Sequence, residues 1–285
     1  MVQAHTQITI PIVAIVIGAG ALHATWNAII KYLDDGLAAF ALIGVASTVG
    51  GAALLAVTGL PHGAAVGYAA TSAVIHIGYD LALMNSYRLG SFNQVYPIAR
   101  GTSPLLVAFG AFFLAGEHLG VVPLAGVAIL AAGLASLALS SGRLTRAELP
   151  AIGAAVATGI TIAAYTIVDG LGVRHGHDPY AYAGLLFFLM GPVFPVIAAV
   201  RRRGVSWLTG PAAGGGLLAG VLSLIAYGIV LWAQTQAPLA EVAAIRETSV
   251  VFAALIGMML FSERFGGRRV AAAVLVAAGI VLISI

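Results

Sequence analysis

Charged residues are scarce in this sequence: Asp, Glu, Lys and Arg make up 8% of the 285 residues, whereas a soluble domain carries about 25%. Hydrophobic residues make up 61%, and the mean hydropathy is +1.04, so most of the surface must face lipid. Cysteine is absent, which excludes disulfides and thiolate metal sites. No basic segment precedes the first apolar run, so no signal peptide is expected. These absences predict a polytopic membrane protein.

Motifs of catalysis are also lacking. No zinc triad, nucleophile elbow or P-loop occurs, so we predict no cofactor, no metal and no ATP-driven pumping by this chain. The net charge of +3 comes from a few loop arginines, so nucleic acid is not an expected partner. One enzyme class is a weak alternative, because Tyr79-Asp80 resembles half of an intramembrane aspartyl protease. Asp169 lacks the glycines that precede the second aspartate of such proteases, so we expect no enzyme.

Long apolar runs dominate the chain instead. Each is close to the roughly 20 residues that a helix needs to cross a bilayer. They are solidly apolar, without the alternation of barrel strands, which favours helices. The sequence therefore predicts an all-α membrane protein with ten transmembrane helices, at residues 8–31, 37–59, 65–87, 93–114, 119–139, 149–171, 179–200, 212–235, 239–260 and 267–285.

Basic residues in the connections predict the orientation. Ten lysines and arginines follow odd-numbered spans, and only Arg174 lies at an even-numbered connection. Because cytoplasmic loops carry an excess of Lys and Arg, the odd-numbered connections should be cytoplasmic and both termini outside.

Two stretches of the chain repeat one pattern. Arg100, Ser103, Glu117 and Gly133 recur at one constant offset, as Arg246, Ser249, Glu263 and Gly279. Each copy would hold five spans, an odd number, so the second must be inverted relative to the first. We therefore predict two inverted five-helix repeats, 1–142 and 143–285, around a central cavity near the membrane midplane.

Polar side chains inside the spans are the candidate site, since each is costly in lipid unless it faces a cavity or a partner. Those on spans 1, 3, 4, 6, 8 and 9 predict a cavity lined by both halves. The candidate cavity residues are His23, Trp26, Asn27, His76, Tyr79, Asp80, Tyr96, Arg100, Tyr165, Asp169, Tyr227, Trp232, Arg246, Glu247 and Ser249.

Two interpretations of these groups stay open. The arginines either form structural ion pairs with Asp80, Asp169 or Glu247, or contact the substrate and gate the pathway. His76 is either a satisfied core histidine or a proton carrier or substrate contact, and each aromatic ring either packs or lines the cavity. Pro97 and Pro104 bracket Arg100 and are candidate hinges, because proline interrupts helical hydrogen bonds; two prolines in span 7 are weaker candidates.

Four motifs resemble the drug/metabolite transporter superfamily: HATWNAIIK (23–31), YPIARGTSP (96–104), YTIVDGLG (165–172) and IRETS (245–249) followed by SERF (262–265). The chain is most similar to the ten-helix branch built from two EamA-type repeats. This resemblance implies a basket of helices 1–4 and 6–9, with 5 and 10 at the sides, that moves small metabolites by alternating access. Within this branch the chain most resembles bacterial amino-acid exporters, including those for aromatic amino acids. This resemblance implies that the protein lies in the bacterial cytoplasmic (inner) membrane.

The predicted function is secondary transport of a small metabolite, in the direction of export. The predicted substrate is an amino acid, and aromatic amino acids are favoured. Aromatic rings would supply flat walls, an arginine could bind the carboxylate, and Asp80, Asp169 or Glu247 could bind the ammonium. Transport of a phosphorylated sugar, nucleoside or other metabolite is the alternative, and a channel is another. The expected partners are the substrate and the bilayer, and the sequence is compatible with a monomer.

Overall fold

The computed structural model of the protein describes residues 8–33, 35–90, 92–138, 146–176, 178–261 and 267–285. Within these ranges every regular element is a helix and none is a strand. In chain order the helices are α1 (Ile10–Tyr32), α2 (Gly36–Thr58), α3 (Ala65–Leu89), α4 (Phe92–Gly110), the π-helical turn η1 (Ala111–Ala115), α5 (Val121–Ala138), the 3-10 turn η3 (Arg146–Glu148), α6 (Leu149–Gly176), α7 (Pro179–Met190), α8 (Val193–Arg202), the 3-10 turn η4 (Ser206–Leu208), α9 (Ala213–Gln234), α10 (Leu239–Arg246), α11 (Ser249–Phe261) and α12 (Gly267–Ile283).

These helices cover the ten apolar runs, with α7 and α8 sharing the seventh run and α10 and α11 the ninth. Six helical segments of the described residues are long and apolar enough to cross a membrane. They are Ile10–Tyr32, Gly36–Thr58, Val95–Ala115, Arg146–Gly176, Pro179–Arg202 and Ala213–Gln234. The protein is therefore a multi-pass membrane protein, and the full set of ten crossings stays a prediction.

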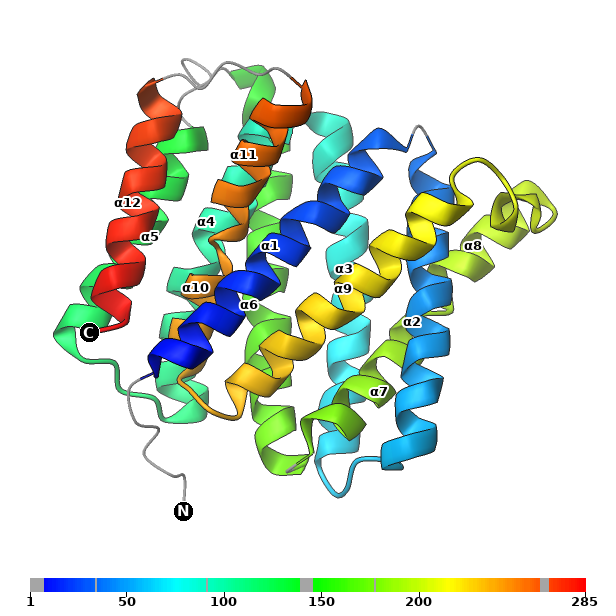
Figure 1. Ribbon diagram of the computed structural model, residues 1–285, viewed down its shortest axis with the longest axis horizontal. Coiled ribbons are helices and arrows are strands. Elements are labelled where there is room, and N and C mark those ends of the chain that lie inside the picture. The colour runs from blue at the N-terminus through cyan, green and yellow to red at the C-terminus, as the bar shows by residue number, and fades with distance from the viewer. Residues whose placement is uncertain (1–7, 34, 91, 139–145, 177, 262–266) are drawn as a thin grey trace.

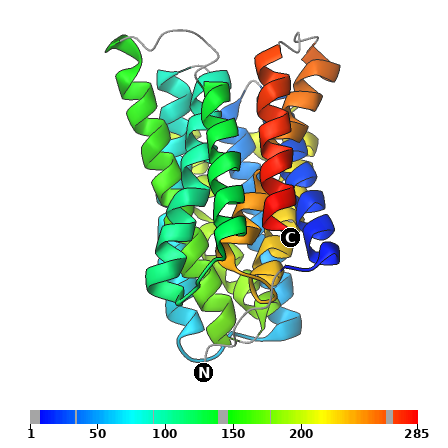
Figure 2. The same cartoon turned by 90° about the vertical axis from the view of Figure 1, so that its left-hand side faces the viewer.

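The chain runs back and forth between two ends of the molecule (Figure 1). Helices α5 and α12 pack against each other at one edge, which faces the viewer in Figure 2. Helix α2 packs on α7 and α8 toward the opposite edge, while α1 packs on α9 and α6 packs on both α3 and α4 in between. The fifth and tenth runs thus lie to the side of the others, as the resemblance implied.

Small residues allow the edge helices to approach closely. A Cβ atom added to Gly126 of α5 would lie 2.7 Å from the carbonyl oxygen of Gly279 of α12, and the reverse distance is also 2.7 Å. About two turns further along α5, a Cβ on Gly133 would lie 2.9 Å from Leu275 Cβ. Because lipid provides no hydrophobic drive for helices to associate, such backbone contact is how these helices stay together.

Two of the apolar runs are interrupted in mid-course, and both breaks shape the interior. Helix α7 ends at Met190, and α8 restarts at Val193 after Gly191 and Pro192. Helix α10 ends at Arg246, and Glu247 and Thr248 form a turn before α11 begins at Ser249. Helix α4, by contrast, stays helical through Pro97 and Pro104 and changes only at its end into η1. Hinging at these two prolines stays a prediction.

Candidate functional site

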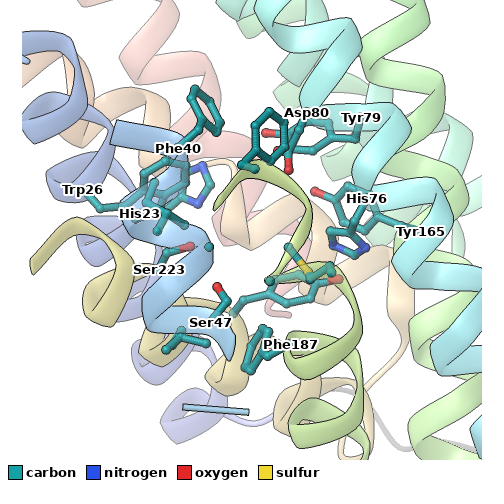
Figure 3. A pocket seen from close by; sticks show the side chains of 17 residues that line it. His23, Trp26, Phe40, Ser47, His76, Tyr79, Asp80, Tyr165, Phe187 and Ser223 are labelled. Atoms are coloured by element: carbon teal, nitrogen blue, oxygen red, sulfur yellow. The ribbon is translucent and has the colours of Figure 1, made fainter. Parts of the chain in front are cut away.

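A pocket opens among α1, α2, α3, α6, α7, α8 and α9 (Figure 3). It encloses about 780 Å³ of space free of atoms, a volume that includes its open mouth. Its walls are mainly aromatic and aliphatic, with a few polar groups. The lining residues are His23, Trp26, Phe40, Ile43, Gly44, Ser47, His76, Tyr79, Asp80, Tyr165, Phe187, Met190, Gly191, Phe194, Ser223, Leu224 and Tyr227.

Seven of the candidate cavity residues line this pocket, six with a ring and Asp80 with a carboxylate: His23, Trp26, His76, Tyr79, Asp80, Tyr165 and Tyr227. The His76 ring stacks on Tyr165 at 4.0 Å between centroids and meets the edge of Tyr227 at 5.3 Å. On the α1 side, His23 and Trp26 meet edge to face at 5.0 Å. The pocket is therefore bounded by two aromatic clusters that come from separate helices.

His76 has one of its ring nitrogens fixed by its own helix. Its Nδ1 lies 3.0 Å from the carbonyl oxygen of Ser72 and 3.1 Å from the Ser72 hydroxyl. Depending on the tautomer, Nδ1 donates to this carbonyl or accepts from the Ser72 hydroxyl, and Nε2 takes the other role in the neutral ring. The imidazole thus serves as a wall of the pocket with one polar edge not used by α3.

Asp169 lies directly behind the pocket wall and is completely buried. Its Oδ1 accepts a hydrogen bond from the Tyr182 hydroxyl at 2.8 Å, and its Oδ2 accepts one from the Tyr227 hydroxyl. Both carboxylate oxygens are therefore occupied by tyrosines of α7 and α9. Asp169 orients the Tyr227 ring rather than lining the pocket itself.

The two arginines form a separate buried cluster with Glu247. Arg100 Nε lies 2.7 Å from Glu247 Oε2, Arg100 Nη2 donates to Ser249 Oγ at 2.8 Å, and Arg246 Nε lies 3.9 Å from Glu247 Oε1. Arg100 is 2% exposed, Arg246 3% and Glu247 0%. The break between α10 and α11 places Glu247 opposite α4, so this cluster joins the two halves of the chain.

Tyr165 separates the arginine cluster from the pocket. The Arg246 guanidinium lies 5.9 Å from the centre of the Tyr165 ring, and the same ring lines the pocket and stacks on His76. Arg100 lies at the same distance from the Tyr96 ring, away from the pocket lining. Neither arginine is among the lining residues.

The remaining candidate residues do not line the pocket. Asn27 donates its side-chain amide to the carbonyl oxygen of His23 at 2.8 Å, within α1. Trp232 is half-buried and packs, with buried Tyr96, in the largest hydrophobic cluster. Pro97 and Pro104 lie on α4, outside the pocket lining.

Sequence reasoning missed the α2 wall and the wall at the α7–α8 break. It also left Ser223 and Leu224 of α9 out of the candidate set, although Ser223 lies on a polar stripe. Phe40, Phe187 and Phe194 could not be told from lipid-facing residues by composition. The sequence signal that could have identified these walls was Gly44, where α2 crosses the α7–α8 break. A Cβ on Gly44 would lie 2.6 Å from Pro195 Cδ, next to the interruption at Gly191.

A second polar cluster lies at one end of the molecule and was not predicted as a unit. Arg174 at the end of α6 pairs with Glu117 at 2.7 Å, and it donates to the carbonyl oxygens of Gln234 and Ala237 at 2.9 Å each. Glu117 in turn accepts the backbone N–H of Leu239, at the start of α10. This cluster ties the loop after η1 to three segments of the second half.

Among the described residues, no group of three His, Cys, Asp or Glu side chains could hold a metal ion. The groups that the described lining residues offer to a ligand are ring faces, hydroxyls, imidazoles and the Asp80 carboxylate.

Comparisons with known proteins point to membrane transport. Residues 149–285 match the EamA-like transporter family, so the second half of the chain carries a domain of this family. No curated protein matches the chain. A solved structure described only as "Crystal structure of protein" is similar, with 18% sequence identity and a TM-score of 0.74 over 96% of this chain and 98% of that chain. At this identity the likeness shows a shared fold.

Proposed function

We propose that this protein is a secondary transporter that moves a small metabolite across the membrane by alternating access. The observation that carries the proposal is the position of the pocket. Ser47, His76 and Ser223 lie at or next to the midpoints of α2, α3 and α9, so the pocket lies halfway along the helices. The EamA-like domain in residues 149–285 supports the same conclusion.

The helix contacts support two inverted repeats, 1–142 and 143–285. If each run of the first half corresponds to the run five places later, the contact of α1 with α9 corresponds to that of α6 with α3. The contact of α1 with α11 likewise corresponds to that of α6 with α4, while α5–α12 maps onto itself. In Figure 1, α1 and α6 run in opposite directions, as inversion requires.

The two ends of the pocket differ, as expected for a transporter whose binding site is open to one side of the membrane at a time. Behind its Phe187 and Tyr227 end lie fully buried residues, Tyr182 and Leu231 among them. Beyond these, the Arg174–Glu117 cluster joins the two halves. By the distribution of loop arginines this end faces outside, so export would require the cluster to open. The same distribution supports both termini outside. The inner membrane of a bacterium is supported by the resemblance to bacterial exporters.

Within this proposal the substrate is an aromatic compound that carries an ammonium group, and an aromatic amino acid is the example that the resemblance favours. Aromatic walls suit a flat ring, and Asp80 suits the ammonium. A phosphorylated sugar is less well supported, because no Lys or Arg of the described part of the chain lines the pocket. An aspartyl protease is also less well supported: its two carboxylates must share a proton, whereas both oxygens of Asp169 are bonded to tyrosines.

The test is counterflow into proteoliposomes that contain the purified full chain. We expect saturable, trans-stimulated uptake of labelled phenylalanine, tyrosine or tryptophan above that of protein-free liposomes, and little uptake of glucose 6-phosphate or uridine. His76→Ala should reduce uptake, whereas Val74→Ala should not, because Val74 is exposed on the outside of the same helix. Uptake that does not saturate would indicate a channel, and no uptake of any compound would refute the proposal.

A further inference from the structure

Of the described residues, Asp80 is the one carboxylate that lines the pocket, and none of the described Lys or Arg residues lines it. Across residues 8–33, 35–90, 92–138, 146–176, 178–261 and 267–285, no side chain or backbone group forms a hydrogen bond or ion pair with this carboxylate. Figure 3 shows it at the end of the pocket that also holds Phe40 and Tyr79. The acid is therefore presented to the cavity without a protein partner.

A carboxylate inside the membrane is stable only beside a cation or strong donors, because losing water costs more than neutral contacts return. The two intramembrane arginines are not in reach of the pocket. Arg100 is paired with Glu247 and Ser249, and Arg246 lies behind the Tyr165 ring. The positive charge that neutralises the ionised form of Asp80 can then be a proton or a cationic group of a ligand that enters the cavity.

We propose that the pocket recognises an organic amine: Asp80 binds the ammonium group, and the aromatic walls hold an aromatic body. This inference rests on the proposed function and names the substrate class of the same site. Trp26, Phe40 and Tyr79 line the cavity together with Asp80. Ring faces attract cations as well as other rings, so both parts of an aromatic amine find a matching surface.

A carboxylate on the substrate is not matched in the same way. In an amino acid the carboxylate is one carbon from the ammonium, so it would enter next to Asp80 and be repelled. Among the described lining residues, the polar groups left to receive it carry no fixed positive charge: the hydroxyls of serines and tyrosines, the Trp26 indole and the rings of His23 and His76. We therefore expect the decarboxylated amine to bind more tightly than the amino acid from which it derives.

One rival arrangement makes the opposite prediction. Within the described residues, Arg246 Nε and Nη2 donate no hydrogen bond. If the Tyr165 ring swung aside, Arg246 could receive a substrate carboxylate. Tyrosine would then bind at least as tightly as tyramine, which would overturn the inference.

The experiment is a competition series on the purified full chain in detergent, with labelled tyramine as the probe. The competitors are tyramine, tyrosine methyl ester, tyrosine and 3-(4-hydroxyphenyl)propionate, which differ only in the ammonium and carboxylate groups. Since hydrogen bonds to charged groups are the strong ones, we expect tyramine and the ester to bind roughly tenfold or more tightly than tyrosine. The propionate should be weakest, and propionate binding as tight as that of tyramine would overturn the inference.

Variants identify the carboxylate responsible. Asp80→Asn should weaken tyramine binding roughly tenfold or more without weakening the propionate, because the ion pair is lost and the repulsion relieved. Asp35→Asn is the matched control, since Asp35 lies in the connection before α2 and asparagine also caps helices. Unchanged tyramine binding by a folded Asp80→Asn protein would overturn the inference. Should this variant fail to fold, the wild-type competition series decides alone.

Flux in proteoliposomes separates this inference from the proposed function. Tyramine binding that depends on Asp80, with no flux of any substrate, would support the amine site and refute transport. Saturable amino-acid flux that is equal in wild type and Asp80→Asn would support transport and overturn the amine site.

Discussion

Removal of the Glu117 side chain tests the role of the polar cluster at the proposed outer end. Glu117 pairs with Arg174 at 2.7 Å and accepts the Leu239 N–H at 2.8 and 2.9 Å. The side chains of the pair are 14% exposed for Arg174 and 6% for Glu117. In Glu117→Ala, both the guanidinium and the first N–H of α10 lose their acidic partner.

The magnitude follows from burial. Breaking a fully buried ion pair costs about 3–5 kcal/mol, whereas an exposed pair is worth about 0–1 kcal/mol. Arg174 keeps its bonds to Gln234 and Ala237 and some contact with solvent, so we expect about 2–3 kcal/mol for Glu117→Ala. Glu117→Gln keeps an acceptor for Leu239 and should cost about 1 kcal/mol.

The assay is thermal unfolding of the purified protein in detergent. With roughly 2 °C per kcal/mol for a chain of this size, Glu117→Ala should lower the Tm by about 5 °C. Arg202→Ala is the control, because Arg202 and Asp35 form a pair at 2.5 Å whose side chains are 34% and 38% exposed. Equal Tm shifts in the two variants would refute the reasoning. So would an Arg174→Ala/Glu117→Ala double variant whose loss equals the sum of the single losses, since coupled residues are not additive.

Three further predictions follow from the fold and the interior charges. Arg100→Ala and Arg246→Ala should each lower proteoliposome flux. Membrane insertion should persist, because removing an intramembrane charge eases insertion by about 2.5 kcal/mol. Normal uptake by both variants would contradict this prediction. Gly126→Leu should destabilise the α5–α12 contact by about 1–3 kcal/mol, whereas Gly153→Leu, which has open space around its Cβ, should not, and equal unfolding curves would refute the packing argument. A cysteine at exposed Gly204, in a chain that has no other, should be labelled only from the cytoplasmic side, and labelling of intact cells by an impermeant reagent would reverse the topology.

The sequence predicted the helices well because lipid imposes a simple rule on it. A segment that crosses hydrocarbon must be apolar and helical for about 20 residues, so hydropathy alone places most of the helices. The run predicted at 149–171 ended early, since Arg174 and His175 looked like loop residues. In the structure α6 continues to Gly176 because Arg174 has partners at that depth.

The site was harder to predict, since hydropathy does not show which way a residue faces. Polar stripes identified His76, Tyr79 and Asp80 on α3, all of which line the pocket. The phenylalanines of α2, α7 and α8 carry no such mark, because an aromatic ring that faces a cavity has the same composition as one that faces lipid. Only the approach of α2 to the α7–α8 break, through Gly44 and Gly191, places them there.

The interior charges show what composition leaves undecided. An arginine in a membrane helix is costly unless it pairs with an acidic group or faces a water-filled cavity. The sequence alone does not distinguish these two arrangements. Glu247 is adjacent to Arg246 in sequence, yet its shorter ion pair is with Arg100, across the two halves of the chain. That pairing removes Arg100 from the substrate's reach, while the Tyr165 ring screens Arg246. The electrostatic character of the pocket is then set by Asp80, because among the described residues it is the lining acid that no protein group offsets.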